Sequence, residues 1–88
     1  MAAATVGGLL GEGTERLKAS ASESPRLDAE LLLGHVLGVE RTSLLAYPDA
    51  LVSDAQAPVF RALVGRRASG EPVAYIRGFK EFHGLAFA

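Results

Sequence analysis

Few side chains in this 88-residue sequence could carry out chemistry, and their spacing argues against a reaction. The two histidines, His35 and His83, lie 48 positions apart, with no carboxylate at metal-ligand spacing beside either. No serine lies in a Gly-x-Ser-x-Gly turn, and no base can be assigned to any of them. The sequence has no cysteine, which excludes thiolate nucleophiles, thiolate metal sites and disulfides. We therefore expect no catalytic, metal-binding or cofactor-binding residue in this chain.

The glycines near the start, Gly7-Gly8 and Gly11-x-Gly13, have the composition of a phosphate-binding loop. Such a loop follows a strand and ends in Gly-Lys-Ser or Gly-Lys-Thr. The sequence predicts no strand before these glycines and contains no such ending after them. Phosphate binding is therefore not expected here.

Four charged residues, Asp28, Glu30, Arg66 and Arg67, are more informative. On a helical wheel Arg67 falls within the apolar face of its helix, where an unpaired charge would be costly. Asp28 and Glu30 flank the apolar face of an earlier helix, expected over residues 25–37. We expect a carboxylate–guanidinium pair between these two helices and interpret it as structural rather than as a binding site. The apolar face around Arg67 consists of Val59, Phe60, Leu63 and Val64.

A second polar group lies near the end of the chain, beside several aromatic residues. It consists of Arg77, Lys80, Glu81 and His83. One interpretation is a solvated face. The alternative is a surface that contacts a macromolecular substrate or a further part of the polypeptide, which makes these four the candidate partner-binding residues.

Composition and charge limit the class of protein. Hydrophobic residues make up 49% of the sequence, which fits one compact domain of this length. Nine Lys and Arg against ten Asp and Glu give a net charge of −1, which does not attract a nucleic-acid backbone. The sequence contains no basic secretory signal and no apolar run of the ~20 residues that span a bilayer. We expect a cytoplasmic protein with no nucleic-acid or membrane partner.

Hydrophobic periodicity predicts two helices in the first half of the chain. Apolar residues at helical spacing define the first over residues 6–21, although its glycines weaken its start. Ser24 as a cap begins the second helix, over residues 25–37, and Gly38 ends it. This second helix is apolar over much of its circumference, which is typical of a central helix.

A short connector is expected next. Residues 41–47 predict one turn of helix that Thr42 caps and that Leu44 and Leu45 anchor in the core.

Two more helices are expected after the connector. Residues 53–56 have capping-box spacing and begin a fourth helix, which Gly70 ends. Pro58 moves the expected first residue of that helix one or two positions later. Glu71-Pro72 begin a short fifth helix, which Gly78 closes.

The pattern changes at the end of the chain. Residues 79–88 predict a β-hairpin with its turn at His83-Gly84. Its second arm is still apolar at Ala88, so we expect the natural polypeptide to continue. The expected fold is mainly α: a helical bundle over residues 1–78, with about five helices, and the start of a β-hairpin linker over residues 79–88.

Two stretches together resemble a known family. They are Ser-Pro-Arg-Leu-Asp-Ala-Glu-Leu-Leu-Leu at residues 24–33 and Arg-Arg-Ala-Ser-Gly-Glu-Pro-Val-Ala-Tyr-Ile-Arg-Gly-Phe-Lys-Glu-Phe-His-Gly-Leu-Ala-Phe at residues 66–87. From about Thr5 onward the chain is similar to the N-terminal domain of the HemK/PrmC family, the release-factor glutamine methyltransferases. The run at residues 70–76, followed by Lys-Glu-Phe-x-Gly at residues 80–84, is the specific part of the resemblance.

The resemblance implies a helical bundle joined by a β-hairpin to a Rossmann-like methyltransferase domain that this chain lacks. In the family, that domain uses S-adenosylmethionine to methylate the glutamine of the Gly-Gly-Gln motif in class 1 peptide-chain release factors, and the helical domain recognises the release factor. The family's cofactor and substrate motifs fall beyond residue 88, so no catalytic or cofactor-binding residue carries over. The resemblance thus implies a substrate-recognition domain, inactive by itself, whose partners are the release factor and its own catalytic domain.

Other functions fit the composition as well. A self-contained helical adaptor would bind a partner helix or peptide and needs an exposed apolar patch of several hundred Å². A third hypothesis is a small nucleic-acid-binding bundle, and the only residues that favour it are Arg66, Arg67, Arg77 and Lys80. The related ribosomal-protein glutamine methyltransferases share the chemistry, but the form Gly-Glu-Pro-Val-Ala-Tyr-Ile favours the release-factor branch.

Overall fold

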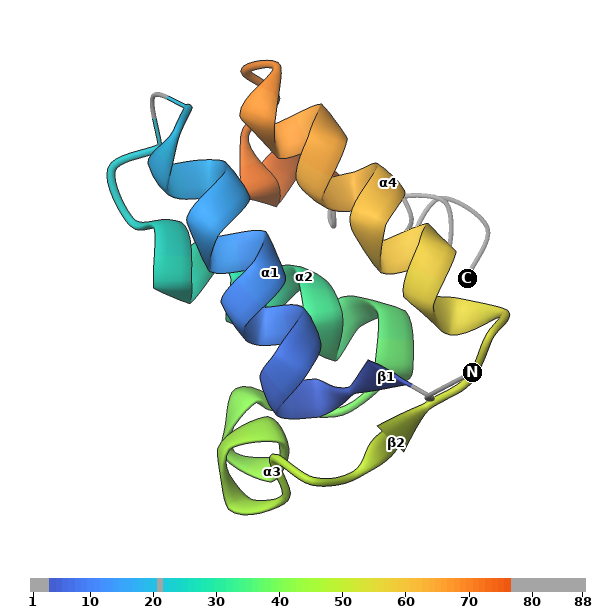
Figure 1. Ribbon diagram of the computed structural model, residues 1–88. Coiled ribbons are helices and arrows are strands. Elements are labelled where there is room, and N and C mark those ends of the chain that lie inside the picture. Colours follow the sequence, from blue (N-terminus) through green and yellow to red (C-terminus); the bar gives the residue numbers. More distant parts are fainter. Residues whose placement is uncertain (1–3, 21, 77–88) are drawn as a thin grey trace, which may run out of the picture.

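The computed structural model describes residues 4–20 and 22–76 as a small bundle of helices. Three long helices form its body, and a short helix with a two-strand sheet closes one end (Figure 1). A further helical turn covers residues 73–76, so these ranges contain five helical segments, as the sequence predicts. The elements in chain order are β1 (Ala4–Thr5), α1 (Val6–Lys18), α2 (Pro25–Leu37), α3 (Arg41–Ala46), β2 (Leu51–Val52) and α4 (Gln56–Ala68).

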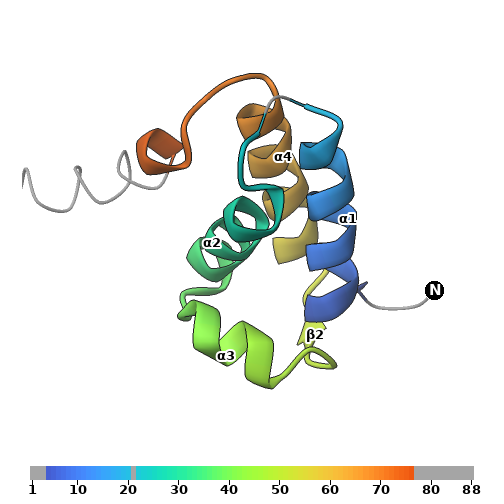
Figure 2. The same ribbon diagram turned by 90° about the vertical axis from the view of Figure 1, so that its left-hand side faces the viewer.

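The three long helices pack against one another around one core. α1 and α4 lie side by side and run in the same direction, whereas α2 runs the opposite way (Figure 1 and Figure 2). The close approach of α1 and α4 depends on Gly13, because a Cβ there would lie 2.8 Å from Cζ of Phe60. The buried apolar side chains of the described residues are Val6, Leu9, Leu10, Leu17, Ala29, Leu32, Leu33, Leu44, Val52, Ala57, Phe60, Val64 and Ile76.

The start of α1 is held by the connection between α3 and α4. The N–H groups of Val6 and Gly7 donate to the carbonyls of Ala50 and Pro48 at 2.9 and 2.8 Å. Thr5 Oγ1 caps the helix by accepting a backbone N–H of its first turn at 3.0 Å. Strand β1 pairs antiparallel with β2. The prediction that no strand precedes the glycines is therefore wrong, because a two-residue strand is too short for periodicity to reveal.

The bounds of α2 agree with the sequence. Gly38 adopts a left-handed φ of 73°, and its N–H donates to the Gly34 carbonyl at 2.8 Å, which closes the helix. The prediction that Ser24 caps the start is wrong, because its side chain makes no capping hydrogen bond. Ser24 has ψ 66°, not the extended backbone that aims a capping side chain at the first turn. The first helix also departs from expectation, since α1 ends at Lys18 and Ala21 lies outside the described residues.

The connector α3 has one core anchor rather than two. Leu44 is buried, whereas half of the Leu45 surface is exposed. Glu40, not Thr42, occupies the N-cap position of the helix. Successive residues of a helix point about 100° apart, so a short surface helix buries only one of two adjacent leucines. The prediction for Leu45 is wrong for that reason. The prediction for Thr42 is wrong because the helix already begins at Arg41.

The start of α4 agrees with the capping-box spacing. Ser53 Oγ accepts the Gln56 N–H at 3.1 Å and donates to Gln56 Oε1 at 3.1 Å. A cap at Ser53 would make Asp54 the first helical residue, whereas α4 begins two positions later, at Gln56. The later start predicted from Pro58 is therefore confirmed, and Pro58 lies in the first turn, which tolerates proline. The prediction that Val59 faces the core is wrong, because its side chain is half-exposed. The buried stripe of α4 instead follows helical spacing through Ala57, Phe60 and Val64.

The last part of the predicted fold lies outside the described residues. This part includes Gly78, the β-hairpin over residues 79–88 and its His83-Gly84 turn. Within residues 4–20 and 22–76, the mainly helical class is confirmed. None of the helices in these ranges is long and apolar enough to cross a membrane.

Candidate functional site

Asp28 and Arg67 lie against each other where α2 meets the end of α4. Arg67 Nε donates to Asp28 Oδ2 at 2.9 Å, and Ser22 Oγ donates to the same oxygen at 2.7 Å. Arg67 Nη1 also donates to the Glu71 carbonyl at 3.5 Å. Both charged side chains are largely buried. Partly buried, hydrogen-bonded charges of this kind join two helices in one arrangement.

Glu30 is not a partner of Arg67. Its carboxylate accepts from Arg26 Nε at 2.8 Å and from Arg41 Nε at 3.0 Å, so it links α2 to α3. Only 5% of the Glu30 side chain is exposed, whereas about half of each arginine is in solvent. Burial by itself raises the pKa of Glu30, but the hydrogen bonds from Arg26 and Arg41 outweigh it and hold the pKa below its ordinary value.

Replacing this carboxylate tests its contribution to stability. The pKa of Glu30 is lowered in the folded state, so its stabilisation is present above the unfolded pKa of about 4.3 and is lost as the pH falls through the folded pKa. Glu30→Gln should lower the free energy of unfolding by about 1–2 kcal/mol at pH 7. At pH 3 the difference from wild type should be smaller, as urea unfolding at both pH values would show.

A surface carboxylate provides the control for that variant. Glu15 forms an exposed pair with Lys18 on α1, at 3.3 Å. Glu15→Gln should change stability by less than about 0.5 kcal/mol, because such pairs contribute little. An equal loss for Glu30→Gln at pH 7 and pH 3 would contradict the role assigned to the charge.

The structure describes only some of the basic and partner-binding residues that the sequence predicts. Arg66 Nη2 and Nε donate to the two carboxylate oxygens of Glu71 at 2.7 and 3.0 Å, and the Arg66 hydrogen bonds hold the pKa of Glu71 below its ordinary value. Arg67 pairs with Asp28 in the same way. The nucleic-acid hypothesis depends in part on Arg66 and Arg67, and each of these two arginines already has a carboxylate partner. The candidate partner-binding residues Arg77, Lys80, Glu81 and His83 lie outside the described residues.

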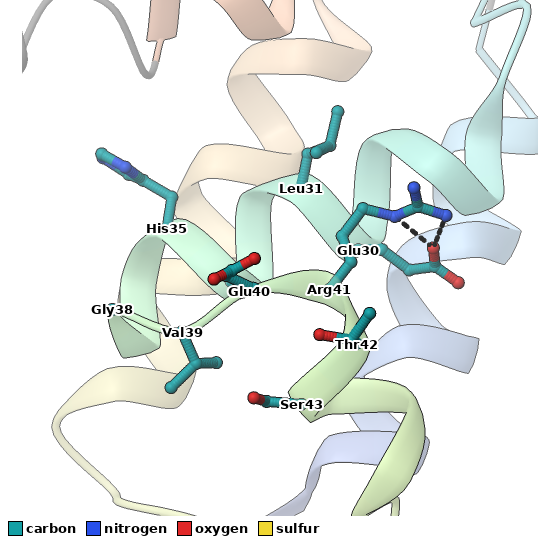
Figure 3. A pocket seen from close by; sticks show the side chains of 10 residues that line it. Glu30, Leu31, His35, Gly38, Val39, Glu40, Arg41, Thr42 and Ser43 are labelled. Atoms are coloured by element: carbon teal, nitrogen blue, oxygen red, sulfur yellow. Dashed lines mark hydrogen bonds and ion pairs between the residues drawn. The ribbon is translucent and has the colours of Figure 1, made fainter.

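An open hollow of about 820 Å³ lies between α2 and α3 (Figure 3). Leu31 and His35 line it from α2, and Glu40, Thr42 and Ser43 line it from the other side. One wall thus offers apolar surface and an imidazole, and the other offers a carboxylate and two hydroxyls. This mixture suits the binding of a polypeptide segment.

A second, smaller hollow of about 330 Å³ shares His35 with the first. Its remaining lining comes from Val36, Gln56, Val59, Leu63, Arg66 and Ile76. The two hollows therefore border the same face of α2, one toward α3 and the other toward α4 and residues 73–76. Figure 2 shows α2 itself between α3 and the helical turn that precedes residue 77.

The larger hollow was not predicted from the sequence. The residue that could have indicated it is Gly34, where the chain folds back closely after α2. The Gly34 carbonyl accepts the N–H groups of both Gly38 and Val39, at 2.8 and 3.0 Å. A Cβ on Gly34 would lie 2.7 Å from the Val39 carbonyl oxygen. The chain thus folds back tightly after α2 and places α3 beside it, a tertiary contact that periodicity does not encode.

Across residues 4–20 and 22–76 there is no group of three or more His, Cys, Asp and Glu side chains that could hold a metal ion. A family model described as the PrmC N-terminal domain matches residues 8–78.

This chain belongs to that family.

Curated relatives agree with the family. The chain is 47% identical over 85 residues to a release factor glutamine methyltransferase of Nitratidesulfovibrio vulgaris, a match that covers 97% of this chain and 29% of the relative. Identity to the enzyme of the same name from Aliivibrio fischeri is 46% over 77 residues, with 88% of this chain and 27% of the relative covered. Identity to the release factor glutamine methyltransferase of Escherichia coli is 49% over 65 residues, a match that covers 74% of this chain and 24% of the relative.

These matches confirm the resemblance to the PrmC N-terminal domain. The chain spans less than a third of the length of the relatives described above. No solved structure matches the chain.

Proposed function

We propose that this chain is the substrate-recognition domain of a cytoplasmic methyltransferase that modifies the glutamine of the Gly-Gly-Gln motif in class 1 release factors. The alignment to the relatives carries the proposal, because 97% of this chain corresponds to only 29% of a release factor glutamine methyltransferase at 47% identity. A segment of that size is a domain of the enzyme, and its chemistry belongs to the rest of the polypeptide. S-adenosylmethionine is the cofactor of the complete enzyme in this proposal.

The physical character of the described residues supports a recognition role. The bundle has buried helix-joining ion pairs and two hollows beside α2, but no metal-holding cluster in the ranges described. An enzyme that modifies one side chain of a large protein gains selectivity from contacts remote from the reacting atoms, since such contacts hold the substrate in register. A separate rigid domain supplies these contacts without altering the cofactor pocket.

Arg77, Lys80, Glu81 and His83 remain part of this proposal as partner-binding residues. They directly follow the described turn at residues 73–76 in the sequence. The proposal assigns them contacts with the release factor.

The proposed function can be tested with the 88-residue chain itself. Isotope-labelled chain would be titrated with a class 1 release factor and, separately, with S-adenosylmethionine, and amide chemical shifts would be recorded. The release factor should cause shifts or line broadening in a saturable manner, whereas S-adenosylmethionine should cause none. An unrelated protein of similar size and net charge serves as the control. A folded chain that does not respond to the release factor would refute recognition by this domain.

A further inference from the structure

Most charged side chains in the described ranges are neutralised by a neighbour. Six ion pairs engage five carboxylates and six cations. Arg16 is the remaining described cation among the lysines and arginines, and its Nη1 donates to a carbonyl on α4 at 3.4 Å. Four carboxylates in these ranges form no ion pair or hydrogen bond: Glu23, Glu40, Asp49 and Asp54. Uncompensated charge on the described surface is thus concentrated in carboxylates, three of them between residues 40 and 54.

The same part of the chain carries exposed apolar surface. Of seven large hydrophobic side chains that are exposed in the described residues, four lie between residues 39 and 51. Two of these, Leu51 and Tyr47, are the most exposed of the seven, at 72% and 68%. Val39 and Leu45 are 42% and 50% exposed. Apolar side chains gathered in this way are typical of an interaction surface.

The backbone beneath this surface is fixed. The Ala50 N–H donates to the Tyr47 carbonyl at 3.1 Å and closes a turn between α3 and β2. Pro48 and Ala50 in turn accept N–H groups from the start of α1. Figure 1 shows α3, this turn and β2 together at the end of the bundle where α1 begins. A side chain on such a backbone loses less freedom on binding than one on a loose loop.

We propose that this end of the bundle docks a basic segment of the protein substrate that also carries apolar side chains. The docking face consists of Glu40, Leu45, Tyr47, Asp49, Leu51 and Asp54. The only cation between residues 39 and 54 is Arg41, which Glu30 already holds at 2.9 Å. A partner that approaches this face must therefore bring its own positive charge, together with apolar groups to cover the exposed tyrosine and leucines.

Charge argues against a second copy of this chain as the occupant. A symmetric contact would bring the same three carboxylates face to face from both copies, and like charges in an interface are unfavourable. The lysines and arginines in the described ranges, apart from Arg16, are in ion pairs already. The identity of the partner as the methyltransferase's protein substrate rests on the proposed function.

Two variants of the docking face test the inference. One removes charge by Glu40→Gln, Asp49→Asn and Asp54→Asn together, and the other removes apolar contact by Tyr47→Ser and Leu51→Ser together. Each should raise the Kd for a class 1 release factor about tenfold or more, by isothermal titration calorimetry. The charge variant should also show a weaker dependence of Kd on salt concentration than wild type.

Matched controls come from the same chain. Glu23→Gln removes the fourth unpaired carboxylate, which lies before α2 rather than in the docking face. Leu27→Ser removes an exposed leucine from the first turn of α2. Both should leave the Kd within about twofold of wild type, because neither touches the docking face. All the substituted side chains are exposed, and circular dichroism would verify that each variant is folded.

The possible outcomes separate the inference from the proposed function. If wild-type chain binds the release factor and the docking-face variants bind equally well, the inference is wrong and the proposed function stands. If wild-type chain does not bind the release factor, the proposed function fails, and the inference fails with it. Concentration-dependent self-association that the Tyr47→Ser and Leu51→Ser changes abolish would also overturn the inference, since it would identify a second copy as the occupant.

Discussion

Phe60→Ala should lower the free energy of unfolding by about 3–5 kcal/mol, the largest single-residue effect we expect in this protein. The ring is completely buried and lies directly over Gly13, with no room for a Cβ between them. Removing it leaves a cavity where α4 packs on α1, and the rigid helices around it can collapse only in part.

The size of this loss relative to the whole protein makes the effect visible. A domain of 88 residues has a total stability of roughly 4–13 kcal/mol at the usual 0.05–0.15 kcal/mol per residue. Phe60→Ala therefore removes a large share of it, and the midpoint of unfolding should fall well below that of wild type. Urea unfolding followed by circular dichroism at 25 °C measures the change.

The neighbouring residue of α4 supplies the control for Phe60→Ala. Val59 is 49% exposed, so Val59→Ala should change stability by less than about 1 kcal/mol. A loss below 1 kcal/mol for Phe60→Ala, or equal losses for the two variants, would show that the ring does not form the centre of the core.

Gly34→Ala is expected to destabilise the protein by about 2–3 kcal/mol, although alanine is the better helix former. The added Cβ would lie 2.7 Å from the Val39 carbonyl oxygen. That atom belongs to the backbone that joins α2 to α3, and the Val39 N–H donates to the Gly34 carbonyl. Relief of the clash therefore requires α3 to move away from α2, which strains the contact between Arg41 and Glu30 as well.

Gly11 provides a matched control for Gly34, since the same substitution should have the opposite sign there. Gly11 is an exposed residue of α1, and an added Cβ would meet no atom within 4 Å. Gly11→Ala should stabilise the protein by about 0.5–1 kcal/mol, because glycine costs that much relative to alanine inside a helix. Thermal unfolding of the two variants beside wild type gives the comparison. Stabilisation by both substitutions would show that the α2–α3 contact is loose.

Proline, glycine and capping residues predicted the helices well. Hydrophobic periodicity was less successful in predicting which residues of each helix are exposed. The bounds of α2 and the left-handed Gly38 follow from proline and glycine, whose backbone preferences act within a few residues. The contact of Ser53 with Gln56 is local for the same reason. Leu45 and Val59 were misplaced because a helical wheel ranks residues by hydrophobicity, while burial depends on which side of the helix has a neighbour.

The sequence could limit the expected partners of Arg67 to Asp28 and Glu30, but it could not decide between these two carboxylates. It indicated that Arg67 needs a carboxylate, since Arg67 shares a face with apolar residues. Asp28 and Glu30 are two positions apart on α2 and point about 160° away from each other, so only the relative rotation of α2 and α4 decides which of them meets Arg67. The structure places Asp28 there and turns Glu30 toward Arg41 on α3.

By itself the sequence determined the family of this protein, its mainly helical class and the ends of α2, because motifs and capping residues act over short distances. Only the tertiary structure decided the hollows beside α2, the partners of Glu30 and the exposed face around Tyr47 and Leu51. Each of those features joins residues from different elements. Their formation depends on how the helices pack, and packing is a property of the whole chain rather than of any short segment of it.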